Sequence, residues 1–460
     1  MSMLPGVAAG HPTTARAGAE ILHAGGSAAD AAVAMMLVSC AAETIFTGLS
    51  GGGFAIYYDA ASRQATCLNF FVQIPGTTGR ARGDGVPIEV IFVGQQVPYD
   101  IGPSTVAVPG VPAGAKRIWE RWGRLAWADV VAPGLAASYG TPFSQAHADL
   151  LPLVSQAMHV GDGDWVYRRP DGAFLQAGDV LVHEDQHLAY RLLAQDPDAF
   201  YHGAFAHAMV EAVADGGALD LADLETYEVV ESEPRVVSWR GTQVAARGDD
   251  LDDLLGTLAE VRSGGTDVRS DPDLARSLVT ALRAPDRRAE TTNCVAVDAD
   301  GNACAITTTL GLGSGVWVPG YGVHLNSMLG EGELIRGELV PGQRMGSMMS
   351  PLLVFADGEP VIVAGAAGGS RIRPALIQCL LGMVGGLPPQ QAIDAPRLNA
   401  VPGLVRLEPG FSEAVVGALR QQGDEVAIAD TLAPYFGGVS AISTLGGGAD
   451  VRRGGTVIVV

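Results

Sequence analysis

Apolar and polar positions along the chain predict helices that alternate with paired strands. Helical periodicity covers residues 13–23 and 27–42, and the second stretch begins with the Ser-x-x-Asp pattern of a helix cap. After a run of glycines, residues 54–58 and 66–70 flank a polar turn, as the two strands of a hairpin do. Two packed helices are therefore expected before the first strands.

The same pattern continues through the rest of the chain. Further helices are predicted at residues 116–122, 187–194, 206–214, 221–227 and 375–384, and short apolar strands at 352–355 and 361–363. No internal repeat and no low-complexity tract interrupts this order. Sheets flanked by helices, an α/β architecture, are therefore expected.

A second hairpin is clearer than the first. Residues 294–297 and 303–309 flank the segment 298–302, whose Asp-Gly step suits a tight turn. Thr291 therefore stands at the head of a strand. If the peptide bond before it breaks, Thr291 becomes an N-terminal residue that carries both a hydroxyl nucleophile and an amine base.

The segment ahead of Thr291 has a different composition. Residues 248–290 are rich in charge and contain Gly264 and Gly265, which favours a mobile connector outside the core. We therefore expect a larger part, 1–290, whose connector runs over about 242–290, and a smaller part, 291–460.

Composition excludes several classes of partner. The 460 residues include 50 Asp and Glu against 29 Lys and Arg, and the net charge of −21 repels nucleic acid and anionic membranes. The longest apolar stretch, 28–42, contains Asp30 and is too short to cross a bilayer. Because the first residues lack the features of a secretory signal, a cytoplasmic protein is expected.

Metal and cofactor binding have little support in the sequence. The five cysteines show no C-x-x-C spacing, and buried small side chains are the simpler interpretation. His183 and His187 fit the H-E-x-x-H zinc pattern, but His183 is expected to lie before a helix rather than on it. We expect no metal and no cofactor, and a small molecule as the substrate.

Three groups of residues could serve a threonine nucleophile. Thr309 ends the returning hairpin strand, so antiparallel pairing brings it back beside Thr291. Gly368 and Gly369 follow a predicted strand and could offer two N–H groups to an oxyanion. Ser347 lies in a loop before another strand and could add a hydroxyl donor. Taken singly, each is more often an ordinary turn residue.

Several blocks together closely resemble the gamma-glutamyltransferases, which are N-terminal nucleophile hydrolases. The resemblance rests on residues 291–292, 297–303, 307–310, 344–351 and 365–371, and extends to 11–30, 51–54, 109–110, 200–203 and 221–227. It covers nearly the whole chain. It implies the four-layer αββα sandwich of that family and a precursor that cuts itself between Glu290 and Thr291.

The resemblance also implies a role for each matching residue. Thr291 would be the nucleophile and its freed α-amine the general base, supported by Thr309. The N–H groups of Gly368 and Gly369 would form the oxyanion hole. The two fragments would remain associated with each other.

At the substrate-binding positions the sequence departs from the family. Phe71 stands where the family has an arginine for the substrate carboxylate, and Gly311 where it has an asparagine. Met328 and Glu331 replace a glutamine and an aspartate, and Met348 replaces a serine. A buried carboxylate without its arginine costs about 2 to 5 kcal/mol, so a glutamyl group should be a poor substrate.

The sequence therefore predicts a self-processing enzyme that cleaves an acyl bond of a small, non-glutamyl metabolite, in a biosynthetic role. One alternative within the same chemistry is cleavage of a carbon–carbon bond, as described for gamma-glutamyltransferase-like proteins that remove an oxalyl-type unit in alkylproline antibiotic biosynthesis. Another alternative is a catalytically silent binding protein on the same fold.

Overall fold

The structure is a computed structural model that describes residues 2–92, 95–261, 264–284 and 291–460. Its α-helices are α1 (Pro12–His23), α2 (Ala28–Ala42), α3 (Val111–Trp122), α4 (Trp127–Ala137), α5 (Gln145–Leu150), α6 (Ser155–Met158), α7 (Gly163–Val166), α8 (Gln186–Gln195), α9 (Gly203–Ala212), α10 (Leu221–Glu225), α11 (Leu254–Glu260), α12 (Pro272–Leu282), α13 (Ile372–Val384), α14 (Pro389–Asp394) and α15 (Glu413–Gln421).

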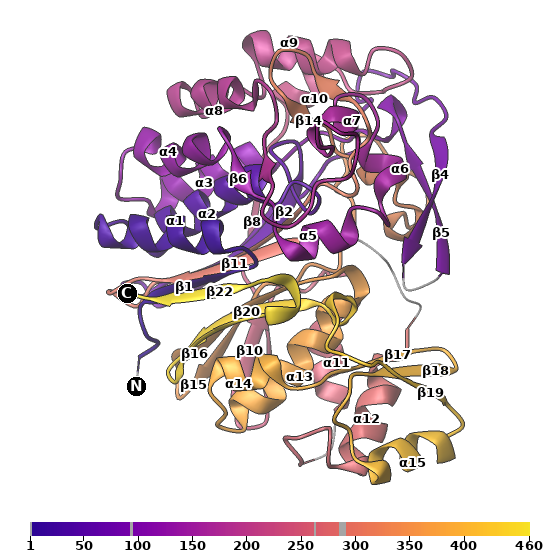
Figure 1. Ribbon diagram of the computed structural model, residues 1–460. Helices are drawn as coiled ribbons and strands as arrows, with labels where there is room; N and C mark the ends of the chain where they lie inside the picture. The colour runs from indigo at the N-terminus through magenta and orange to yellow at the C-terminus, as the bar shows by residue number, and fades with distance from the viewer. Residues whose placement is uncertain (1, 93–94, 262–263, 285–290) are drawn as a thin grey trace.

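Two stacked sheets form the centre (Figure 1). The first has the order β22 (Thr456–Val459), β1 (Gly6–Ala9), β11 (Thr292–Val297), β12 (Ala303–Thr309), β2 (Gly52–Asp59), β3 (Gln64–Phe70) and β8 (Val230–Ser232). The second has the order β21 (Gly446–Ala449), β20 (Gly438–Ser443), β16 (Glu359–Ala367), β15 (Leu352–Ala356), β10 (Thr242–Ala246) and β9 (Arg235–Trp239).

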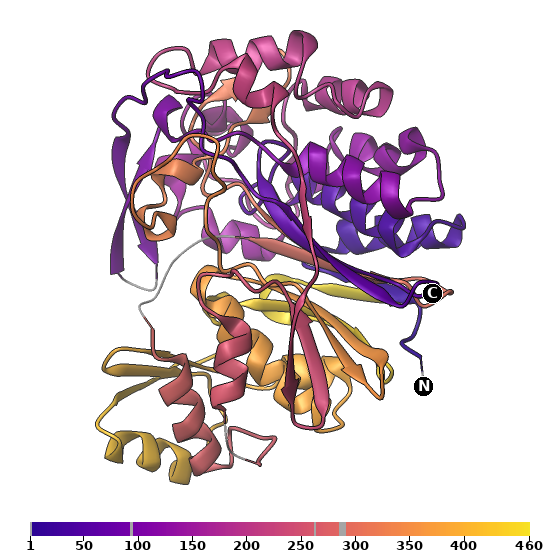
Figure 2. The ribbon, with the colours of Figure 1, turned by 180° about the vertical axis from the view of Figure 1, so that it is seen from behind.

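The remaining strands form small peripheral sheets. They are β4 (Val86–Phe92) with β5 (Gln95–Ile101), β6 (Thr141–Pro142) with β7 (Val180–Leu181), β13 (Trp317–Val318) with β14 (Val323–His324), and β17 (Leu398–Val401) with β18 (Leu404–Leu407) and β19 (Glu425–Ile428). The hairpin β4–β5 stands at the edge of the molecule in both views (Figure 2).

Helices cover the outer face of each central sheet. α1 and α2 pack on the first sheet, α13 and α14 pack on the second, and the two sheets pack face to face through β11, β12, β16 and β20. The result is the αββα sandwich that the family resemblance implied. In both views the two chain ends lie side by side, because β1 and β22 are paired (Figures 1 and 2).

Strand β11 shows why the layers hold together. Cys294 and Ala296 point into the apolar cluster under the helices, whereas Val295 and Val297 point into the cluster between the sheets. Side chains alternate along a strand, so a strand that is apolar at every position is covered on both faces. The odd-numbered face of β11 therefore meets the second sheet.

Both predicted hairpins are confirmed. β2 pairs with β3, and β11 pairs with β12 across a turn in which Gly301 has a φ of 84°. The cap of the second helix is also confirmed, since Ser27 and Asp30 exchange side-chain to backbone hydrogen bonds at the start of α2.

The expectation of a connector outside the core is wrong for residues 242–261 and 264–282. This part forms β10, α11 and α12, and the side chains of Leu274, Leu278 and Leu282 are buried in the cluster beneath the second sheet. Charged residues on the outer face of α12 concealed its apolar stripe. Residues 285–290, and Glu290 with them, lie outside the described part of the chain.

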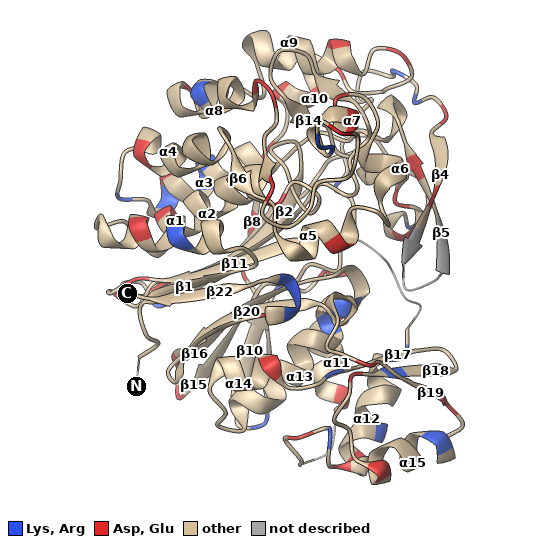
Figure 3. Ribbon diagram, viewed as in Figure 1, with Lys and Arg blue, Asp and Glu red and all other residues tan. Residues whose placement is uncertain are grey.

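Charge is distributed unevenly over the layers. Charged positions lie mainly on helices and loops, and the strands of the two central sheets are almost entirely uncharged (Figure 3). Among the described residues, no helix combines the length and the apolar character that crossing a bilayer requires.

Candidate active site

Thr291 lies directly before β11 at the end of the sandwich, with 2% of its surface exposed. Its side chain belongs to the odd-numbered face, which meets the second sheet. There the backbone N–H of Gly368 donates a hydrogen bond of 2.7 Å to the Thr291 hydroxyl oxygen. The predicted nucleophile and one of the two predicted oxyanion donors are therefore in direct contact.

The backbone of the glycine pair explains this contact. Gly368 and Gly369 follow β16 and have φ values of 123° and 60°, in the region that favours glycine. A Cβ atom on Gly368 would lie 3.1 Å from the Cα of Gly437. Glycine at 368 therefore lets the turn approach β20 closely and aim its N–H at Thr291.

Thr309 lies where the antiparallel register predicts it. β11 and β12 pair Thr292 with Thr308, so the next step of the same register sets Thr309 opposite Thr291. The Thr309 hydroxyl accepts a hydrogen bond of 3.0 Å from the N–H of Gly311.

A buried carboxylate that the sequence analysis missed lies behind the nucleophile. Glu43, which follows α2, accepts hydrogen bonds from the hydroxyls of Thr14, at 2.7 Å, and Thr292, at 2.5 Å. It is 1% exposed. A charged residue directly after the largely apolar run 28–42 was the signal that could have identified it.

Arg453 was also missed. Its guanidinium lies 3.4 Å from the carbonyl oxygen of Thr291, although 162 positions separate the two residues. Arg453, Glu43 and Thr291 line one cavity of about 10 Å³, roughly enough for a single water molecule.

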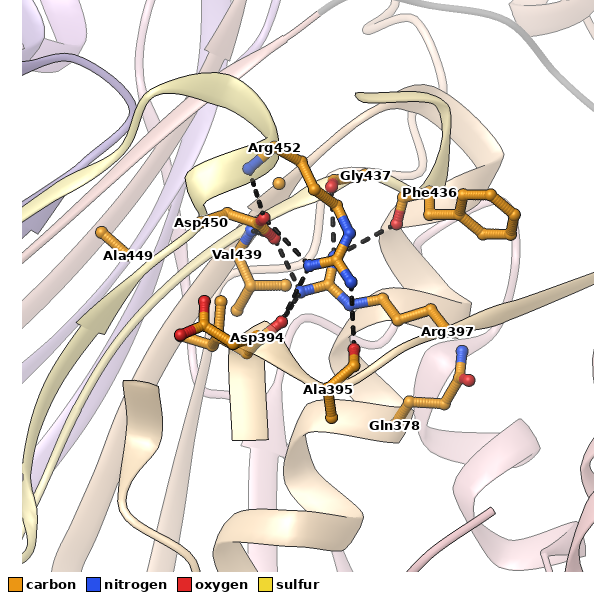
Figure 4. A network of polar contacts seen from close by, with 12 residues as sticks. Gln378, Asp394, Ala395, Arg397, Phe436, Gly437, Val439, Ala449, Asp450 and Arg452 are labelled. Carbon is orange, nitrogen blue, oxygen red and sulfur yellow. Dashed lines mark hydrogen bonds and ion pairs between the residues drawn. The ribbon is translucent and has the colours of Figure 1, made fainter. Parts of the chain in front are cut away.

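A buried network of ion pairs fixes the segment beside this cavity (Figure 4). Asp450 accepts hydrogen bonds from Arg397, at 2.6 Å, and from the N–H of Val439, at 3.1 Å. Arg452 pairs with Asp450 and with Glu408. Burial alone would raise the pKa of Asp450, but the two arginines outweigh it and lower that pKa.

This network reaches the nucleophile through β20. Arg397 donates to the carbonyls of Phe436 and Gly437, and the next residue, Gly438, accepts a 3.0 Å hydrogen bond from the Asn293 side chain. Asn293 lies two positions after Thr291. The network therefore ties the start of β20 to the strand that carries the nucleophile.

The three apolar residues at the positions that the resemblance assigns to substrate binding are all buried. Phe71, Met328 and Met348 are buried in the same cluster, with exposures of 0%, 0% and 3%. The ring centroid of Phe71 lies 5.4 Å from that of Phe54. The positions that the resemblance assigns to a polar glutamyl group therefore hold buried apolar side chains.

Gly311 and Glu331 lie against each other. A Cβ atom on Gly311 would lie 2.7 Å from both a Glu331 carboxylate oxygen and the Ser327 hydroxyl. Glu331 also accepts a 2.5 Å hydrogen bond from Tyr99, whose pKa is raised well above its usual value by burial and then by Glu331. The longer side chain at 331 occupies the space that a side chain at 311 would need.

The structure gives no sign of a shared site for Ser347 or for the H-E-x-x-H pattern among the residues it describes. The Ser347 hydroxyl accepts the N–H of Met349 within its own loop, at 3.2 Å. α8 begins at Gln186, so His183 lies before the helix, as expected, and the H-E-x-x-H spacing does not bring His183 and His187 onto one helix.

Comparison with known proteins decides the family. The chain matches gamma-glutamyltranspeptidase over residues 14–249 and 260–460. It belongs to the gamma-glutamyltranspeptidase family. It is 26% identical to the glutathione hydrolase proenzyme of Bacillus subtilis, over 98% of this chain and 91% of that protein. It is 27% identical to the acylase ACY 1 proenzyme of a Pseudomonas species, over 99% and 93%.

Solved structures agree on the fold of this gamma-glutamyltranspeptidase family member. The cephalosporin acylase of Bacillus halodurans matches with a TM-score of 0.83 and 22% identity, over 100% of this chain and 96% of that one. Family membership makes the chain an enzyme of the hydrolase or transferase type, and the structural match gives it the fold of an N-terminal nucleophile hydrolase.

Proposed function

We propose that the chain is a precursor that cuts itself between Glu290 and Thr291 and then acts as an N-terminal threonine hydrolase. The fragments 1–290 and 291–460 stay together, because β11 is an inner strand of the first sheet, between β1 and β12. The observation that carries the proposal is the 2.7 Å hydrogen bond from Gly368 to the Thr291 hydroxyl.

The freed α-amine of Thr291 serves as the general base. It accepts the hydroxyl proton while the oxygen attacks the substrate carbonyl, and an acyl-enzyme forms as the leaving group departs with a proton. The N–H groups of Gly368 and Gly369 stabilise the negative charge on the carbonyl oxygen, and Thr309 supports the nucleophile. Water then releases the acyl group.

The substrate is a small acyl compound other than a glutamyl derivative. The support comes from Phe71, Met328 and Met348, whose packed apolar side chains offer a carboxylate no partner. The relatives named acylases match this chain as fully as those named glutathione hydrolases. An apolar acyl group fits this arrangement better than a charged one.

Two experiments test the proposal. Denaturing electrophoresis of the purified protein should give two bands, and a single band after prolonged incubation would support a silent binding protein instead. In a panel of acyl anilides, apolar acyl groups should react faster than the gamma-glutamyl anilide. Efficient turnover of the gamma-glutamyl compound would overturn the argument from Phe71.

A further inference from the structure

Arg453 is a cation in direct contact with the backbone of the proposed nucleophile. It ends the short helix η6 (Val451–Arg453) and is 7% exposed. One guanidinium nitrogen lies 3.4 Å from the Thr291 carbonyl oxygen, and the other would lie 3.5 Å from a Cβ atom on Gly368. Its guanidinium carbon lies 5.1 Å from the ring centroid of Phe46.

We propose that Arg453 is a positioning residue that keeps the α-amine of the processed Thr291 uncharged near neutral pH. The inference rests on the proposed function, because the amine exists only after cleavage before Thr291. Arg453 acts through Thr291 and does not itself touch the reacting carbonyl.

The distances make this charge effective. Three covalent bonds separate the carbonyl oxygen of a residue from its own nitrogen, so the guanidinium lies within about 7 Å of the Thr291 nitrogen. Arginine stays protonated at every physiological pH. A second positive charge nearby disfavours the ammonium form, and burial weakens the screening by solvent and salt.

Two acidic groups also face the cavity. Glu43 faces the cavity from the end of α2, accepts hydrogen bonds from the hydroxyls of Thr14 and Thr292, and opposes the effect of Arg453. Asp450 faces the cavity from the loop before η6, and its carboxylate is paired with two arginines.

The neighbouring elements also carry basic groups, namely His11, His147 and Arg371. Burial lowers the pKa of His11 at the start of α1, and it lowers that of His147 in α5 well below the usual value, with His11 and Arg453 adding to the effect on His147. Both imidazoles are therefore neutral at pH 7. Arg371 directs its Nε at the carbonyl of Tyr435. Arg453, at the end of η6, is thus the residue whose positive charge we propose to lower the pKa of the Thr291 amine.

For the reaction, the consequence is a larger fraction of unprotonated amine at neutral pH. An ordinary α-amine has a pKa of about 7.7 to 8.0 and is mostly protonated at pH 7. A lower value leaves more of it free to accept the hydroxyl proton. The hydrogen bond from Arg453 to the Thr291 carbonyl also holds the backbone of Thr291 in place after the peptide bond before it breaks.

The test measures the amine directly and needs no substrate. Processed protein is labelled with trace acetic anhydride across roughly pH 5 to 10, and mass spectrometry follows acetylation of the peptide that begins at Thr291. In Arg453→Met the amine should titrate about one unit higher than in the wild type. Arg453→Lys, which keeps the charge, should stay close to the wild type.

Arg63→Met is the matched control, because it removes the same charge from an exposed ion pair with Glu359. An unchanged titration in Arg453→Met, or an equal shift in Arg453→Lys, would overturn the proposal. Electrophoresis of each variant precedes the labelling. If Arg453→Met and Arg453→Gln both stay uncut while Arg453→Lys is cut, the charge serves cleavage and the proposal fails. If the wild type stays uncut, the proposed function itself fails.

Discussion

The end of the sandwich that carries Thr291 and the apolar cluster around Phe71 differ in what they keep of the family pattern. The first retains the threonine, the glycine pair and a hairpin that pairs Thr292 with Thr308. The second has Phe71, Met328 and Met348 where the family resemblance implies polar substrate partners, and all three are buried in one large apolar cluster.

The comparison separates chemistry from specificity. The groups proposed for bond cleavage lie at a backbone turn and a strand end, where few residue types fit the geometry. The substrate positions lie in a packed cluster, where one set of side chains replaces another provided that the volume is filled. Substitutions near Thr291 should therefore abolish self-cleavage and turnover, whereas substitutions in the cluster around Phe71 should change the choice of acyl group.

Thr291→Ala should have the largest effect. Without the hydroxyl the precursor should stay uncut, and turnover of any accepted acyl anilide should fall by at least about a thousandfold. Electrophoresis and anilide release measure both effects. Thr291→Ser, which keeps a hydroxyl, should still be cut. An uncut Thr291→Ala chain that retained full activity would show that Thr291 is not needed for catalysis.

Asp450→Asn should lower the free energy of unfolding by about 3 to 5 kcal/mol, because it leaves Arg397 and Arg452 buried beside a neutral group. Urea unfolding at neutral pH measures the loss. Asp300→Asn, at an exposed ion pair, should change stability by less than about 1 kcal/mol. Equal effects of the two changes would show that the network does not stabilise the nucleophile end.

The same residue gives a pH dependence with a defined sign. The folded-state pKa of Asp450 lies below its ordinary value, so its contribution is present above the ordinary value and is lost as pH falls through the folded one. Acidification below about pH 4 should therefore destabilise the wild type more steeply than Asp450→Asn. Parallel acid unfolding curves would contradict this.

Gly368→Ala should slow the acylation step by about 100- to 1000-fold, because the turn that presents its N–H cannot keep its geometry. Gly403→Ala is the control: Gly403 also has a positive φ, but a Cβ atom there meets nothing within 4 Å. Rates with the same anilide compare the two. Similar rates would mean that backbone strain alone, and not the donor beside Thr291, decides the loss.

Met348→Leu should have the smallest effect. A volume-conserving change costs less than about 1.5 kcal/mol of stability and should leave self-cleavage intact. Because the cluster is proposed to select the acyl group, relative rates across the acyl anilides should shift by about tenfold. Met35→Leu, in the cluster under the helices, should leave that selectivity unchanged. A loss of self-cleavage in Met348→Leu would show that the cluster around Phe71 also serves the cleavage chemistry.

Local features were predictable from the sequence. The cap at Ser27, the hairpin turn at Gly301 and the pairing of the strands 292–297 and 303–309 follow from spacing within a few tens of residues. The layer order came from the family resemblance, because periodicity alone does not say how two sheets stack. The helix α12 was missed because charged residues surround its apolar stripe.

Long-range contacts were not predictable. Glu43 and Arg453 lie beside the nucleophile although 249 positions separate Glu43 from Thr292 and 162 separate Arg453 from Thr291. Nothing local to either residue identifies its partner. The end strands β1 and β22 were missed for the same reason, since their pairing joins the two termini of the chain.

The most direct test of the account is the intact mass and N-terminal sequence of active protein. The account predicts two fragments, the smaller of which begins at Thr291. Full-length chain alone in active material, with activity that survives Thr291→Ala, would contradict it.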